Sequence, residues 1–119
     1  MKSGGVFEIP DDAWLSTFLG VAPDEAKPGD GFWAFSVTDS TGTSLKISLH
    51  AFERSVQLTL KHKDRELASV SQEGARLLKT IQRDGERWIE CDFEWEGAKS
   101  HLSAKVAPNI ALTWSSLIV

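Results

Sequence analysis

Hydrophobic and polar residues alternate along most of the chain that follows Gly31. Trp33, Phe35 and Val37 alternate with smaller or more polar residues, and the same period of two recurs further on. Such alternation is typical of β-strands that bury one face. We therefore expect a mainly β protein in which residues 31–119 form an antiparallel β-meander of about seven to eight strands, either a curled sheet or partial barrel, or a sandwich. The other alternating segments are 45–51, 56–61, 88–95, 102–106 and 110–114.

A short N-terminal helix is predicted before the sheet, at residues 10–20. Pro10 and the two acids after it are typical of a helix start, and Gly20 is typical of a helix end. The helix would cover an open end or one face of the sheet, because its apolar residues have the spacing of a single helix face. These apolar residues are Trp14, Leu15, Phe18 and Leu19.

The other N-terminal segments are predicted to lack regular structure. Residues 1–5 are expected to be a flexible terminus. Residues 21–30 are expected to form an acidic loop, because two prolines, a glycine and three acids fall within ten positions. The length of 119 residues fits one domain that spans residues 1–119.

Residues 71–83 allow two interpretations. Leu77, Leu78 and Ile81 could belong to a helix that begins near Ser71. We prefer a strand, because the Asp84-Gly85 pair that follows is a strong signal for a two-residue hairpin turn. A second tight turn is predicted at Glu96-Gly97. Together the two turns predict four cross-strand pairs: Lys79 with Glu90, His101 with Asp92, Lys99 with Glu94, and Lys105 with Trp88.

Composition narrows the function classes. Hydrophobic residues make up 41% and charged residues 25% of the chain, which is ordinary for a globular protein. The formal charge of −4 disfavours a nucleic-acid binder that relies on a basic surface. No apolar run has the length of a signal-peptide core or a membrane span, so we expect a cytoplasmic protein without a membrane partner.

No pattern in the chain reaches the specificity of a catalytic or cofactor signature. The sequence has no P-loop, dinucleotide fingerprint, nucleophile elbow or EF-hand loop. Cys91 alternates in phase with Ile89 and Phe93, so it is predicted to be a core residue rather than a nucleophile. His50, His62 and His101 do not have ligand-like spacing. We therefore expect no enzyme activity, no cofactor and no metal site.

The net acidity is concentrated in one part of the chain. Residues 1–40 hold seven acidic and two basic residues, a formal charge of −5, whereas residues 41–119 have a formal charge of +1. Such a local field attracts a basic partner. Trp88 is added to the candidate partner surface, because it alternates with the acids of its strand and can anchor an interface. The acidic candidates are Asp11, Asp12, Asp24, Glu25 and Asp30.

The order of these segments resembles small acidic bacterial immunity proteins, which neutralise a cognate toxin. The resemblance rests on the acidic helix start at residues 11–15 (DDAWL) and on the antiparallel run that ends in residues 106–112 (VAPNIAL). It implies a non-catalytic binding module whose acidic residues cover a basic toxin surface.

Two other functions remain open from the sequence. A meander of about eight strands can close around an apolar ligand, with Trp33, Phe35, Trp95 and Trp114 as the lining. Alternatively, the chain is a homo-oligomeric accessory protein that pairs as a homodimer through its apolar C-terminal edge, residues 115–119.

Overall fold

The computed structural model describes residues 6–118, with side chains up to Trp114; residues 1–5, predicted to be flexible, and Val119 lie outside this range. Within it the chain forms one α-helix, one short 3-10 helix at Pro28–Asp30 and nine β-strands. The elements are α1 (Asp12–Leu19), β1 (Glu25–Lys27), β2 (Phe32–Thr38), β3 (Thr43–His50), β4 (Ser55–His62), β5 (Arg65–Glu73), β6 (Ala75–Arg83), β7 (Glu86–Trp95), β8 (Ala98–Ala107) and β9 (Ala111–Ile118).

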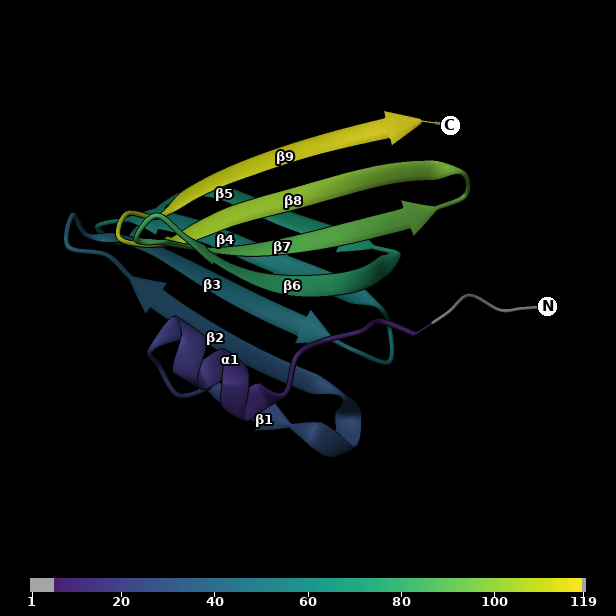
Figure 1. The fold of residues 1–119 in the computed structure, drawn as a ribbon, viewed down its shortest axis with the longest axis horizontal. Helices are drawn as coiled ribbons and strands as arrows, with labels where there is room; N and C mark the ends of the chain where they lie inside the picture. Colours follow the sequence, from purple (N-terminus) through teal and green to yellow (C-terminus); the bar gives the residue numbers. More distant parts are fainter. Residues whose placement is uncertain (1–5, 119) are drawn as a thin grey trace.

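The strands form two antiparallel sheets that do not close into a barrel. The first sheet has the order β1-β2-β3-β4-β5, and the second sheet has the order β6-β7-β8-β9. The two sheets lie face to face, and α1 lies beside them near β2 (Figure 1). The predicted antiparallel fold with an N-terminal helix is therefore confirmed, and of the predicted forms it is the sandwich.

The hairpin registers agree with those predicted from the turns. Lys79 pairs with Glu90, and Lys105 pairs with Trp88. His101 lies opposite Asp92 in the same hairpin. Asp84 and Glu96 both have positive φ, as their two-residue turns require.

The helix spans Asp12–Leu19, within the predicted range of residues 10–20. The Asp11 carboxylate accepts a hydrogen bond from the Ala13 amide, and Gly20 ends the helix in the left-handed conformation. Leu15 and Phe18 are buried in the core. Trp14 was predicted on the same face but is 50% exposed, because it lies at the edge of the sandwich, where its indole nitrogen donates to the Thr80 hydroxyl at 3.0 Å.

The loop predicted at residues 21–30 is more regular than expected. Glu25–Lys27 form β1, which pairs with β2, and Pro28–Asp30 form the 3-10 helix. The amide of Asp24 also donates to the Ala34 carbonyl at 2.7 Å. The side chains of β1 are all exposed, so this strand carries no hydrophobic alternation by which the sequence could reveal it.

Residues 71–83 are strand, as preferred, but they belong to two different sheets. β5 ends at Glu73 and β6 begins at Ala75, so the chain passes from one sheet to the other at Gly74 alone. Gly74 has a φ of +83°, its carbonyl accepts from the Glu94 amide, and the next amide donates to the Arg54 carbonyl.

The core lies between the sheets and is closely filled. Phe35, Leu45 and Cys91 are completely buried there, which confirms Cys91 as a core residue. Burial raises the pKa of the Cys91 thiol. Trp114 is partly buried against Phe93, with ring centroids 5.6 Å apart.

The prediction that Trp95 points into the interior, as a lining residue, is wrong. Trp95 is the last residue of β7 and is 46% exposed. Trp95 stands at the very end of β7, where alternation along the strand does not by itself ensure burial.

The side chain of Asp39 connects the two sheets at the end opposite Gly74. One of its oxygens accepts from the amides of Thr41 and Thr43 in the β2–β3 turn, and the other accepts from the Ile110 amide, just before β9, at 2.9 Å. These hydrogen bonds, led by that from Ile110, lower the pKa of Asp39 to about 2.

We expect Asp39→Asn to destabilise the fold at neutral pH and to matter less in acid. An amide has only one acceptor oxygen, so the new side chain cannot accept hydrogen bonds from both the β2–β3 turn and the Ile110 amide. Because the folded pKa is lowered, the carboxylate stabilises the protein above its ordinary pKa of 3.8, and this contribution disappears as the pH falls towards 2. Urea midpoints of both proteins at pH 7, 4 and 2 should therefore converge with falling pH. A constant difference would contradict the assignment.

Candidate functional site

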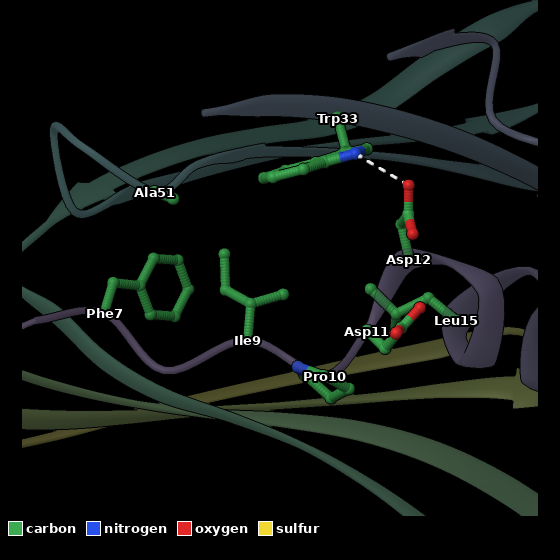
Figure 2. A pocket seen from close by; sticks show the side chains of 8 residues that line it. All are labelled: Phe7, Ile9, Pro10, Asp11, Asp12, Leu15, Trp33 and Ala51. Carbon is green, nitrogen blue, oxygen red and sulfur yellow. Dashed lines mark hydrogen bonds between the residues drawn. The ribbon is translucent and has the colours of Figure 1, made fainter. Parts of the chain in front are cut away.

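The first two acids of the predicted surface lie at the start of α1. Asp11 precedes the helix and caps it, and Asp12 is its first residue. The Asp12 carboxylate accepts from the Trp33 indole nitrogen at 3.2 Å, which ties the helix to β2 (Figure 2). Both aspartates remain exposed.

A pocket of about 350 Å³ opens beside these two carboxylates. The Trp33 indole lies along one side, and Phe7 and Ile9 lie opposite it (Figure 2). The segment before the helix is held against β6, because the Glu8 amide donates to the Arg76 carbonyl and the Leu78 amide donates to the Glu8 carbonyl. The pocket thus combines apolar walls with acids at one end.

Glu25 and Asp30 line a second and larger hollow, of about 610 Å³, on the outer side of the first sheet. Glu25 is 2.9 Å from Lys27, and this contact raises the pKa of Lys27, so the pair is charge-neutral. Asp24 is not part of the hollow: its carboxylate accepts from the Ser36 hydroxyl.

Phe52 and Glu53 are among the residues of this hollow that were not predicted from the sequence. Both residues lie in the turn between β3 and β4. Phe52 is 71% exposed, and the side chain of Glu53 is 77% exposed. The signal available in the sequence was the phenylalanine itself, a large apolar residue between two strands and directly before an acid.

Trp88 is not brought together with the acidic residues. It lies in β7 of the second sheet, with Lys105 of β8 at 5.8 Å from its ring centre. Its indole nitrogen donates to Glu86 at 3.3 Å, and Lys105 contacts the same glutamate. The predicted contact with Lys105 is confirmed, and these partners position Trp88 within its own sheet.

The acids that follow Trp88 also have partners within the second sheet. His101 is 2.7 Å from Asp92 and 3.5 Å from Glu90. Glu94, predicted to face Lys99, lies opposite it in register but forms its ion pair with Arg76 of β6 at 2.9 Å. Exposed pairs of this kind stabilise a protein by about 0–1 kcal/mol each, so they maintain register rather than form a binding site.

Neither metal ligation nor a membrane span is built into the described part of the chain. Within residues 6–118 no three side chains of His, Cys, Asp or Glu gather closely enough to hold a metal ion. The helices in the same range lack the length and apolar character needed to cross a membrane.

The ligand-carrier function requires a closed barrel with an open interior, and the described strands form two separate sheets instead. A void among Ile47, Leu58, Ile89 and their neighbours has a volume of about 10 Å³, roughly the room for one water molecule. Phe35, proposed as a lining residue, is fully buried in the packed core. The sheets also do not close into a barrel.

The fold is that of an antiparallel β-sandwich with exposed acidic residues at the start of α1, in β1 and in the β3–β4 turn, among other places. No protein-family model matches the sequence, and no curated protein matches it either.

Among solved structures, this chain is similar to a chain of a contact-dependent growth inhibition toxin–immunity protein complex from Klebsiella pneumoniae 342. The TM-score is 0.85, and the match covers 95% of this chain and 100% of that chain at 17% sequence identity. At this identity the similarity shows a shared fold. The shared fold is consistent with the resemblance to immunity proteins stated from the sequence.

Proposed function

We propose that this protein is a non-catalytic, immunity-type binding module that inhibits a basic toxin partner. The observation that carries the proposal is the fold similarity to a chain of a toxin–immunity protein complex over nearly the whole of both chains. The reducing cytoplasm is its proposed location, in keeping with the free, buried thiol of Cys91.

The charge distribution supports a basic partner. Asp11, Asp12 and Asp30 are exposed, and none of them has an ion-pair partner among the described side chains. Unneutralised acids on one part of a surface attract a basic protein and raise its association rate. In this proposal they form the centre of the contact surface, with Asp24 and Glu25 at its margin. The position of Trp88 on the other sheet makes it a peripheral contact.

A growth test decides between immunity protein, toxin and neither. Candidate toxin domains encoded in the same genome are induced one at a time in a bacterial host, with and without this chain. We expect one toxin to arrest growth alone and growth to recover when this chain is co-expressed. The purified pair should then co-elute in size-exclusion chromatography.

The chain expressed by itself is the matched control of this test and should leave growth unchanged. Growth arrest by this chain alone would identify it as a toxin. Failure to restore growth against every candidate that arrests it would contradict the proposal.

A further inference from the structure

Phe52 lies flat against the backbone of Gly31. A Cβ atom placed on Gly31 would be 3.0–3.1 Å from the Cγ, Cδ1 and Cδ2 atoms of Phe52, and these nearly equal distances place the glycine against the face of the ring. Gly31 has a φ of +64°, a conformation that favours glycine. The Ala51 amide donates to the Gly31 carbonyl at 2.7 Å, which fixes the two turns together.

The opposite face of the ring is available to a partner. Phe52 remains 71% exposed although one of its faces is covered by the glycine. A large aromatic side chain held in one place on the surface is a typical anchor of a protein interface. A partner residue can therefore cover the open face without first ordering the ring.

Acids line the 610 Å³ hollow together with this ring. Asp30 and Glu53 line it together with Glu25, whose charge is balanced by Lys27. His50 also lines the hollow, 3.6 Å from Glu53, with its ring 4.7 Å from the Phe32 ring. An aromatic face with carboxylates around it complements a flat cation.

We infer that the hollow is a receptor for an arginine side chain of the partner protein, with the guanidinium stacked on the open face of Phe52 and hydrogen-bonded to Asp30 and Glu53. This inference rests on the proposed function and adds to it the chemistry of one contact. Arginine fits better than lysine because its planar guanidinium stacks on aromatic faces and donates in a fixed fork to carboxylates, whereas an ammonium group is a strongly hydrated point charge.

The contact is tested on the isolated protein with small probes. The labelled chain is titrated with N-acetylargininamide and, in parallel, with N-acetyllysinamide, and chemical shifts are followed by NMR. We expect the ring of Phe52 and the amide of Gly31 to shift with the arginine probe and less with the lysine probe. Trp95 is the internal control, because it is also an exposed aromatic residue, with acids on both sides of it in the sequence.

Two substitutions separate stacking from charge. Phe52→Leu keeps an apolar side chain but removes the ring, and should weaken binding of the arginine probe about two- to fivefold, the range of an exposed cation–π contact. Glu53→Gln should weaken it by a similar factor through loss of charge. Equal shifts with both probes, shifts at Trp95 as large as those at Phe52, or unchanged binding by Phe52→Leu would overturn the inference.

The toxin identified in the growth test provides the second measurement. Phe52→Leu should weaken its binding about tenfold, because a central aromatic anchor contributes more in a desolvated interface than with a small probe. Growth protection together with unchanged toxin affinity of Phe52→Leu would overturn this inference and leave the proposed function intact. Absence of any neutralised toxin, with arginine binding at Phe52 retained, would overturn the proposed function alone.

Discussion

Gly74→Ala is expected to lower the free energy of unfolding by about 2–5 kcal/mol, because two costs add at this residue. The first is the left-handed conformation, at a φ of +83°, which costs a residue with a Cβ about 1–2 kcal/mol. The second is steric: the new Cβ would lie 2.6 Å from the Glu94 carbonyl oxygen and 3.2 Å from the Cβ of Trp95. A backbone oxygen cannot move aside cheaply, and such overpacking costs about 1–3 kcal/mol.

Gly20→Ala is the matched control for this prediction. Gly20 has a similar φ of +76°, but a Cβ there would meet nothing within 4 Å. It should therefore show the conformational cost without the clash, about 1–2 kcal/mol. Urea unfolding followed by tryptophan fluorescence measures the unfolding free energy of both variants. Equal losses of unfolding free energy would show that the Glu94 backbone of β7 does not pack closely against Gly74.

Removing three charges from the acidic surface should slow association with the toxin about tenfold or more at low salt and flatten its salt dependence. The variants are Asp11→Asn, Asp12→Asn and Asp30→Asn, combined in one chain. Asparagine keeps a side-chain oxygen for the helix cap at Asp11 and for the Trp33 contact at Asp12, so the change is one of charge. Oriented charge of this kind raises association rates about 10- to 1,000-fold.

The control removes the same number of charges elsewhere. Asp64→Asn, Asp84→Asn and Glu96→Gln change exposed residues in three hairpin turns, where positive φ values suit asparagine at two of the positions. Stopped-flow association rates at several salt concentrations compare the two triple variants. Equal slowing by both would assign the effect to overall charge and exclude the helix start and the adjacent turn as the contact surface.

Much of the fold follows from local sequence signals. The turn pairs at Asp84-Gly85 and Glu96-Gly97 require positive φ, and a two-residue turn leaves only one register for the strands beside it. The pairing of Lys79 with Glu90 could therefore be predicted to the residue. The helix was equally predictable, because Asp11 and Gly20 mark its two ends within the sequence itself.

Features set by distant residues could not be predicted in this way. β1 exists because the free edge of β2 accepts its hydrogen bonds, although its own side chains are all exposed. The exposure of Trp14 and Trp95 depends on where the opposing sheet ends. Phe52 becomes part of a candidate site because the fold places Gly31, twenty-one positions earlier, under its ring.

The predicted site residues were partly separated by the fold for the same reason. Parity along a strand shows that Trp88 points away from the core, but it does not show which of the two sheets the acidic segment will join. The acids at 11, 12, 25 and 30 reach the region of β2 and the β3–β4 turn, whereas Trp88 lies on the other sheet.

The two sheets are joined at opposite ends in different ways, by the chain itself at Gly74 and by the hydrogen bonds of Asp39, and this difference bears on local unfolding. The sheets are covalently continuous at the end that holds the β3–β4 turn, since the amide after Gly74 donates to Arg54 in that turn. At the other end a carboxylate joins them, and acid removes its charge. We therefore expect opening in acid to begin around Asp39 and Ile110, which amide hydrogen exchange at pH 7 and pH 2 would locate.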